Sequence, residues 1–541
     1  MSKLWGLKDV KILIVDDFPA MRSMMRSMLN GFGANNIVEA RNGDEAVERL
    51  AEDTKELVLC DYNLGEQSRD GQQVLEEAKQ RELLPYSSIF VLTTAENTSE
   101  MVMGAVEHLP DDYLVKPFTK VVLQARIRKL QEKKQDLKKI SDAIEQKNYL
   151  RAVSLCDTVM SQNQKLVFEL MKLKGELLIK LSQYDEALAL YKKVLDLREV
   201  NWAQFGCGKA YFFQDALDDA RDMFESVIQQ NKAYVVAYDW LAKVEAALGD
   251  KQKAQQTLAR AVEISPKGLL RQRALAEISY ENEDYDIAER AYKNVVKVGK
   301  NSIYRCPNDY GGLAKVHVKK KASDAALRAI SEMKTNFRNG DSEAMLQSAV
   351  AESVVYKDLG KNDASSAALD RAMGLFNENP GSLSSTAAME LADACFALGR
   401  KEQGSELIKH VVRNHHEDAA VIENAKKIFE SQGMGEEGAA MISGTCQEVI
   451  DVNNDGVDLA KQGKLRESIK LFAKAARAMP ENLIINLNAA QSLIMLMQTD
   501  GASANHMSQA QSYLERVKLI NANNERYKGL LSRYHDLSKR N

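Results

Sequence analysis

Hydrophobic residues in the first 130 positions form short runs that alternate with amphipathic stretches. The runs are rich in Val, Ile and Leu and lie near residues 11–15, 36–40, 57–60, 88–92 and 112–115. Between them, apolar residues recur three and four positions apart, as in 20–29 and 43–50, which is typical of helices that bury one face. Alternating strands and helices predict βαβ units. We therefore expect an α/β doubly wound, five-stranded parallel sheet with helices on both faces.

The pattern changes after about residue 120, where the strand-like runs stop. Residues 121–139 are predicted to form one long charged helix that runs directly into a second domain. Its narrow apolar stripe consists of Ile127, Leu130, Leu137 and Ile140. We place the first domain at residues 8–131 and the second at 132–541.

The second domain contains a repeat of small residues. Alanines recur at spacings of 33, 34 and 34 residues, at Ala187, Ala220, Ala254 and Ala288. An aromatic residue or Leu follows each alanine by four positions, at Tyr191, Phe224, Leu258 and Tyr292. A further small residue precedes each alanine by twelve positions, at Gly175, Gly208, Ala242 and Ala276. This is the tetratricopeptide (TPR) pattern, in which small residues let two helices approach and the aromatic residue fills the gap to the next repeat.

The repeat continues to the end of the chain. Weaker copies occupy the middle of the array, a strong copy returns with Gly456, Phe472 and Ala475, and residues 523–541 are predicted to form a closing amphipathic helix. We expect an all-α TPR superhelix of eight to ten helical hairpins, with a flexible break at 432–438.

Composition narrows the functional classes. The net charge is −4 and the pI about 6.1, so the chain lacks the basic footprint of a nucleic-acid-binding protein. No apolar run reaches the length of a membrane span, so membrane insertion is not expected, and the six widely spaced cysteines predict neither a disulfide framework nor a CxxC metal site. We expect a cytoplasmic protein.

Polar residues follow four of the predicted strands. Asp16 and Asp17 come directly after the first, Asp61 after the third, Thr94 after the fourth and Lys116 after the fifth. Because the carboxyl ends of parallel strands meet at one edge, where ligands bind in such sheets, these side chains are expected to converge. Neighbouring carboxylates raise one another's pKa unless a cation neutralises them, and Mg²⁺ prefers oxygen ligands. The pattern indicates Mg²⁺ binding and phosphoryl chemistry.

These residues carry a resemblance to a known family. The matching motifs are Val15-Asp-Asp17, Ala40-Arg-Asn-Gly43, Cys60-Asp-Tyr-Asn-Leu64, Asp70-Gly71, Leu92-Thr-Thr-Ala-Glu96 and Asp112-Tyr-Leu-Val-Lys-Pro-Phe118. With this set, residues 10 to about 130 resemble a response-regulator receiver domain of the CheY type, which has the flavodoxin/CheY-like fold.

The resemblance implies a role for each polar residue at the strand ends. Asp61 would accept the phosphoryl group, and Lys116 would neutralise phosphate oxygens from a cis peptide bond before Pro117. Asp17 and Asp61 would bind Mg²⁺ directly, Asp16 would do so through water, and the backbone carbonyl of Asn63 would complete the protein ligands.

The resemblance also implies a switch pair, Thr94 and Tyr113, with Thr94 hydrogen-bonding a phosphate oxygen and Glu96 flanking the phosphate. Two segments depart from the usual receiver pattern. The loop 65–70 is longer than usual and lacks the proline that commonly follows Leu64, and 107–110 replaces the common Gly-Ala before the fifth strand.

The concave face of the array is the expected binding surface. The positions predicted to face the groove are Trp202, Phe205, Lys209, Phe212, Asp239, Lys243, Arg273, Glu277 and Tyr280. The alternative is that several of these aromatic residues pack between repeats. A calcium loop at 451–456 is a further alternative, but its twelfth position is Gln462 instead of the bidentate Glu that such loops need.

The whole chain resembles receiver–TPR response regulators of the VieB type. This implies a two-component regulator, not an enzyme with a separate catalytic output, in which a sensor histidine kinase phosphorylates Asp61 and the array binds a protein target according to the phosphoryl state. The alternative is an inhibitory adaptor that sequesters a sensor kinase or another regulator, with phosphorylation secondary. DNA-dependent control is disfavoured by the charge balance and by the lack of a basic recognition helix.

Overall fold

The computed structural model describes residues 6–65, 68–95, 110–337, 341–378, 383–521 and 524–538. The chain divides into two compact units, Met1–Asp309 and Tyr310–Asn541. The first unit contains the sheet domain and the first part of the helical array, and the second contains the rest of the array. The predicted domain boundary at 131/132 lies inside α5 (Lys120–Asp136), and the boundary between the compact units lies inside α16 (Pro307–Lys319). The 131/132 boundary stays a prediction.

The sheet domain has the predicted order of strands and helices. Its elements are β1 (Lys11–Val15), α1 (Pro19–Asn30), β2 (Asn36–Ala40), α2 (Gly43–Glu52), β3 (Leu57–Asp61), α3 (Gly71–Gln80), β4 (Ile89–Thr94), β5 (Asp112–Val115) and α5 (Lys120–Asp136). All strand pairs are parallel, in the order β2-β1-β3-β4-β5. This order confirms the doubly wound α/β prediction.

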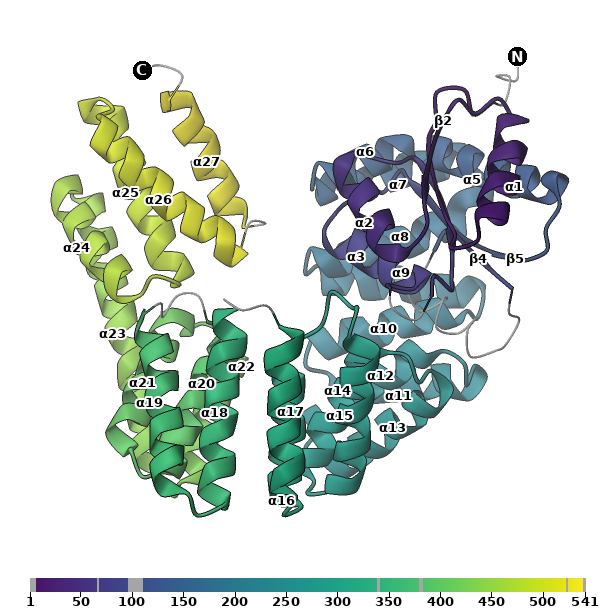
Figure 1. The fold of residues 1–541 in the computed structure, drawn as a ribbon. Helices are drawn as coiled ribbons and strands as arrows, with labels where there is room; N and C mark the ends of the chain where they lie inside the picture. Colours follow the sequence, from purple (N-terminus) through teal and green to yellow (C-terminus); the bar gives the residue numbers. More distant parts are fainter. Residues whose placement is uncertain are drawn as a thin grey trace. The chain divides into compact units, whose positions relative to one another are not determined.

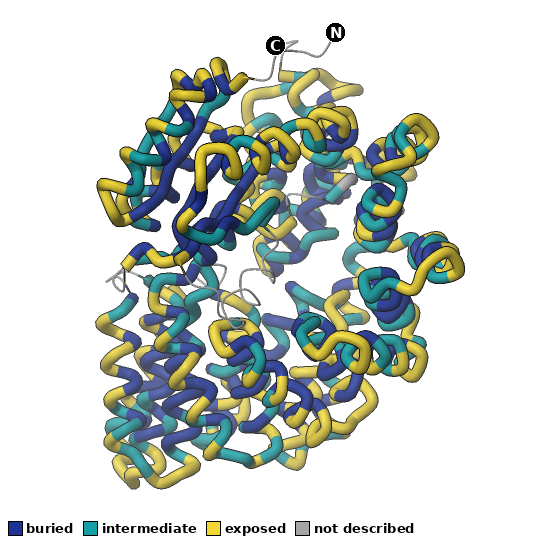
Figure 2. Tube along the Cα trace, turned by 90° about the vertical axis from the view of Figure 1, so that its right-hand side faces the viewer, coloured by how far each residue is buried: buried dark blue, intermediate teal, exposed yellow. Residues whose placement is uncertain are grey.

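Alternating residues of each strand fill the two cores of this domain. Ile12 and Ile14 of β1 face α1 and α5, whereas Leu13 and Val15 face α2 and α3. Figure 1 shows these helix pairs on opposite sides of the sheet, and Figure 2 shows the strands as a buried layer. Burial on both faces explains why the central strands β1, β3 and β4 are nearly continuous apolar runs.

The long helix predicted at 121–139 is interrupted at one residue. Helix α5 ends at Asp136, Leu137 has φ −91° and ψ 0°, and α6 begins at Lys138. The apolar stripe is nevertheless buried as predicted: Ile127, Leu130, Leu137 and Ile140 are at most 7% exposed. The helix ends there because α6 turns to pack against α7 in the first helical hairpin.

The rest of the first unit is a succession of helices in which each packs against the next. They are α6 (Lys138–Glu145), α7 (Tyr149–Gln162), the 3₁₀ turn Gln164–Leu166, α8 (Val167–Lys180), α9 (Tyr184–Leu197), α10 (Asn201–Phe213), α11 (Leu217–Gln230), α12 (Val235–Ala247), α13 (Lys251–Ile264), α14 (Leu269–Glu281) and α15 (Tyr285–Gly299).

The repeat residues read from the sequence lie where the helices meet. The four alanines that define the period are at most 1% exposed, and Tyr191 is 3% exposed. A Cβ atom added to Gly175 or to Gly206 would lie 2.4 Å from the Tyr191 ring, so the ring is enclosed between α8 and α10. Glycine is required at these positions because the aromatic ring occupies the space of a side chain.

The second unit continues the helical pattern. Its helices are α17 (Ser323–Asn336), α18 (Ser342–Asp358), α19 (Asn362–Glu378), α20 (Ser385–Ala397), α21 (Lys401–His415), α22 (Ala419–Ser431), α23 (Gly435–Lys461), α24 (Leu465–Ala478), α25 (Leu483–Asp500), α26 (Ala504–Asn521) and α27 (Glu525–Ser538). The closing helix predicted at 523–541 is found as α27.

The structure contradicts two predictions for this unit. The flexible break predicted at 432–438 is wrong, because a short turn joins α22 to α23 and Gly435 already begins the helix. The calcium-loop alternative at 451–456 is also wrong, since these residues lie inside the 27-residue helix α23. Gly456 instead serves the repeat: a Cβ atom there would lie 2.4 Å from the Phe472 ring.

Candidate functional site

The parallel strands bring three carboxylates to one edge of the sheet. Asp16, Asp17 and Asp61 each offer an oxygen, and these oxygens all lie within 4.8 Å of one another. Asp16 is fully buried, Asp61 is 8% exposed and Asp17 is exposed. The sequence placed these residues at the ends of β1 and β3, and the pairing of those strands is what brings them together.

Lys116 provides the cation of this cluster. Its Nζ atom donates hydrogen bonds to Asp16 Oδ2 at 2.7 Å and to Asp61 Oδ1 at 2.9 Å. The peptide bond between Lys116 and Pro117 is cis, as predicted. Burial alone would lower the pKa of Lys116, but the bonds to Asp16 and Asp61 outweigh it and raise the pKa. The lysine is therefore a fixed positive charge against two of the carboxylates.

The chain segment that carries Asp16 and Asp17 is held by Arg22 of α1. The Arg22 guanidinium donates to the backbone carbonyl of Asp16 at 2.8 Å and to that of Asp17 at 3.3 Å. It also pairs with Glu39 at 3.2 Å. Arg22 was not predicted from the sequence. The signal available there was an arginine in the helix that follows the two aspartates, together with an acidic residue, Glu39, near the end of β2.

Asp61 is an unusually basic carboxylate. Burial raises its pKa to about 6, and the bonds from Lys116 only partly oppose this effect. At neutral pH the carboxylate is ionised but poorly solvated. It is therefore poised to bind a cation or to attack an electrophile.

The donor set fits a hard divalent cation. Three carboxylates face one ammonium group, so the ionised cluster keeps an excess of two negative charges. Carboxylate oxygens are the ligands that Mg²⁺ prefers, and an exposed member such as Asp17 leaves room for the waters that Mg²⁺ retains. Asn63, whose carbonyl is a predicted ligand, is exposed in the loop that follows β3.

The predicted switch pair lies on neighbouring strands. Thr94 ends β4 and is 3% exposed, and Tyr113 is half-buried in β5. In the register Thr94 pairs with Val115, so Tyr113 is two residues away on the same face of β5. Their switching role stays a prediction. Glu96 and residues 107–109 lie outside the described part of the chain.

The aromatic residues predicted for the array groove form a cluster around Trp240. The Phe205 and Phe212 rings contact Trp240 edge-on, with centroids 6.5 and 5.5 Å away. Lys209 and Lys243 place their ammonium groups 5.3 and 4.7 Å from the indole centroid. Trp202 lies apart from this cluster, edge-on to Tyr191. Sequence reasoning missed Trp240, although it directly follows Asp239 in the same predicted helix.

The charged residues predicted for the groove have partners within the array. Asp239 receives two hydrogen bonds from the Arg271 guanidinium, both at 2.7 Å. Arg273 makes the same forked contact with Asp309, at 2.6 and 2.9 Å. These forks fix the side chains in place. The Tyr280 ring packs against Tyr285, and the role of all these residues in partner binding stays a prediction.

A cavity of about 480 Å³ opens beside this cluster, between α12 and α14. Asp239, Lys243 and Glu277 line it from the array, together with Trp240. Glu76 of α3 lines it from the sheet domain. The cavity is thus built by both parts of the first compact unit.

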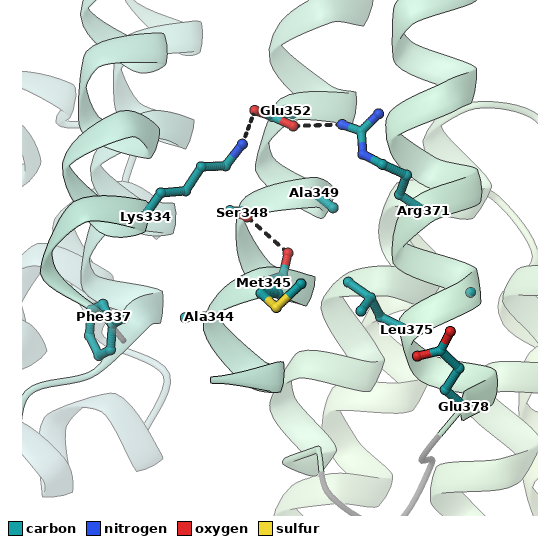
Figure 3. A pocket seen from close by; sticks show the side chains of 11 residues that line it. Lys334, Phe337, Ala344, Met345, Ser348, Ala349, Glu352, Arg371, Leu375 and Glu378 are labelled. Atoms are coloured by element: carbon teal, nitrogen blue, oxygen red, sulfur yellow. Dashed lines mark hydrogen bonds and ion pairs between the residues drawn. The ribbon is translucent and has the colours of Figure 1, made fainter. Parts of the chain in front are cut away.

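The second unit contains a larger cavity of about 660 Å³ among α17, α18 and α19 (Figure 3). Figure 3 shows Glu352 bridging Lys334 and Arg371 at one end, with the side chains of Met345 and Leu375 further along. These ion pairs join three successive helices across the rim of the cavity.

Comparisons with known proteins agree with this geometry. The family model for the response regulator receiver domain matches residues 12–128, and two tetratricopeptide repeat models match 172–235 and 235–267. Chemotaxis protein CheY-3 of Vibrio cholerae is 32% identical over 126 residues, which is 23% of this chain and 95% of the relative. Chemotaxis protein CheY of Pseudomonas aeruginosa is 32% identical over 124 residues, covering 23% and 98% of the two chains.

Solved structures include similar chains for both parts. A CheY-like receiver domain protein from Methanospirillum hungatei is 22% identical, with 23% of this chain and 96% of that chain covered and a TM-score of 0.21. A tetratricopeptide repeat protein from Parabacteroides merdae is 14% identical, with 44% and 92% covered and a TM-score of 0.30.

The fold, the acidic site, the family models and the CheY relatives define the class of the protein as a receiver domain followed by tetratricopeptide repeats. The chain belongs to the response regulator receiver family, as a two-component response regulator that carries a protein-interaction module. The helices in the described ranges are all too short or too polar to cross a lipid bilayer.

Proposed function

We propose that this protein is a phosphoryl-controlled adaptor. A sensor histidine kinase donates a phosphoryl group to Asp61, and the phosphoryl state determines whether the repeat array holds its protein target. The observation that carries the proposal is the bond between Lys116 Nζ and Asp61 Oδ1, 2.9 Å long, at the open edge of the sheet beside two further carboxylates.

The chemistry follows from this geometry. An ionised Asp61 oxygen attacks the phosphorus atom of the kinase phosphohistidine, the new O–P bond forms, and the P–N bond breaks to return the electron pair to the imidazole. Lys116 stays protonated throughout and donates hydrogen bonds to the transferred group, and the Thr94 hydroxyl donates a hydrogen bond to another phosphoryl oxygen. Asp16, Asp17 and Asp61 would hold Mg²⁺, which neutralises phosphoryl charge when bound.

The output of this self-modification is protein binding. A complete switch between two states, from about 1:99 to 99:1, needs about 5.5 kcal/mol of differential stabilisation. A doubly charged phosphoryl group held by Lys116 and a metal ion would supply part of that free energy. The cytoplasmic location expected from the sequence stays a prediction.

The test measures how tightly a partner of the array binds in the two phosphoryl states. A partner isolated with the full chain as bait is titrated against the full chain with and without Mg²⁺ and beryllofluoride. We expect its Kd to differ by about tenfold or more between the two states. Equal Kd values in both states and in Asp61→Asn would contradict the switch and favour the inhibitory adaptor.

The raised pKa of Asp61 makes metal binding depend on pH. Mg²⁺ needs the ionised carboxylate, so its affinity is expected to be level above a pH of about 6 and to fall by about tenfold for each unit below it, as the proton replaces the metal. Isothermal titration with Mg²⁺ measures this slope. In Asp61→Asn we expect weaker binding whose steep fall below pH 6 is lost, and an unchanged slope in that variant would assign the titration to another group.

A further inference from the structure

The receiver touches the array through the segment that follows Asp61. Within the first compact unit, Asn301 Nδ2 donates to the carbonyl of Ser68 at 3.1 Å. Gln73 Nε2 donates to the carbonyl of Val298 at 3.2 Å. These contacts join the β3–α3 loop and the start of α3 to the array segment 298–304, which we call the array clasp.

A second array loop reaches the residue next to the phosphoacceptor. Lys267, between α13 and α14, places its ammonium group 5.1 Å from the ring centroid of Tyr62 and 3.5 Å from its hydroxyl. Tyr62 is only 2% exposed, and its N–H donates to the Thr93 carbonyl at 2.8 Å. The side chain that follows Asp61 is thus fixed between the sheet and the array.

The start of α3 is packed directly against the backbone of Asp61. A Cβ atom on Gly71 would lie 2.2 Å from the Asp61 carbonyl oxygen, so the start of α3 rests directly on the phosphoacceptor backbone. Ser68 Oγ accepts a hydrogen bond from the Gly43 N–H at 2.9 Å, and Arg69 pairs with Glu77 at 2.6 Å. A movement of the Asp61 backbone would therefore displace the start of α3.

These contacts explain why loop 65–70 is longer than usual. Within this loop, the Ser68 carbonyl accepts a hydrogen bond from Asn301 of the array clasp. The Ser68 hydroxyl accepts one from the backbone N–H of Gly43, at the start of α2. A segment that departs from the common receiver pattern thus contacts the array.

Helix α3 of the receiver also lines the array cavity. Glu76, one turn beyond Gln73 in α3, lines the 480 Å³ cavity together with Tyr304 of the array clasp. Tyr304 also lies against α3, with its hydroxyl 3.4 Å from Gln80 Oε1. Any shift of α3 changes the wall of the cavity formed by α12 and α14.

From these contacts we infer that the β3–α3 loop and α3 are the output surface of this receiver, and that phosphorylation of Asp61 acts on the array through Lys267 and the array clasp. The inference rests on the proposed function. It also implies reciprocity: a ligand that binds the cavity more tightly in the presence of beryllofluoride must raise the affinity for beryllofluoride by the same factor.

Hydrogen–deuterium exchange of the full chain tests this route with Mg²⁺ and beryllofluoride as the probe. In the wild type we expect exchange of the array clasp and of residues 265–268 to change by about threefold or more on addition of the probe. The Lys267→Met, Asn301→Ala double variant is expected to bind beryllofluoride, detected by ¹⁹F NMR, while the array response is lost. Lys293→Met, which removes an exposed array lysine paired with Glu289, is the matched control and should respond like the wild type.

The outcomes separate the two proposals. Absence of bound beryllofluoride in the wild type overturns the proposed function and this inference with it. Bound beryllofluoride with unchanged exchange at the array clasp, or an undiminished response in the double variant, overturns only the inferred route.

Discussion

Asp61→Asn is expected to reduce phosphoryl incorporation from acetyl phosphate to background, a loss on the order of a thousandfold or more, since no other group replaces a missing nucleophile. Asparagine keeps the shape of the side chain but has no ionised oxygen to attack phosphorus. Asp16 cannot take over, because it is fully buried and its two oxygens accept bonds from Lys116 and from the Phe18 N–H. Intact-protein mass spectrometry at neutral pH measures the incorporation.

Asp9→Asn provides the control, because Asp9 is exposed and precedes β1, at the edge of the sheet opposite to the acidic site. It should incorporate phosphate at the wild-type rate. Residual incorporation in Asp61→Asn that maps to Asp16 or Asp17 would refute the assignment of the nucleophile.

Phe472→Ala is expected to lower the free energy of unfolding of the second unit by about 3–5 kcal/mol. The ring is 1% exposed and rests directly on the backbone of α23 at Gly456. Truncation leaves a cavity between two helices that cannot close without separating from their neighbours. Urea unfolding measures the loss, and hydrogen exchange in peptides from α23 to α25 locates it.

Leu519→Ala removes a side chain of similar chemistry that is 87% exposed, and it should change stability by no more than about 0.5 kcal/mol. Equal effects of the two substitutions would mean that Phe472 does not hold the repeat together. Added Ca²⁺ should leave both variants unchanged, because residues 451–456 are helical.

The strands and the acidic site were predictable because each rests on a local signal. A strand buried on both faces is a continuous apolar run, and the predicted runs at 11–15 and 57–60 lie in β1 and β3, whose residues are almost all buried. Polar residues directly after such runs must lie at the carboxyl edge of a parallel sheet. That rule placed Asp61 and Lys116 together before any distance was known.

Other features could not be predicted from the sequence, because they depend on contacts between residues far apart in the chain. The break at Leu137 depends on the packing of α6 against α7, and the absence of a flexible break at 432–438 depends on the long helix α23. The sequence did not predict the position of Trp240, because an aromatic residue in a helical repeat can be buried in the core or exposed in the groove. Only its neighbours in the structure distinguish the two.

By itself, the sequence determined the sheet, the 34-residue repeat and the polar residues at the strand ends, since periodicity and residue type act over a few neighbouring positions. Only the tertiary structure decided which surfaces meet. Lys267 and Tyr62 are 205 residues apart, and Asn301 and Ser68 are 233 apart. No periodicity links such pairs, because their contact follows from how the stacked helices bring distant loops back to the sheet.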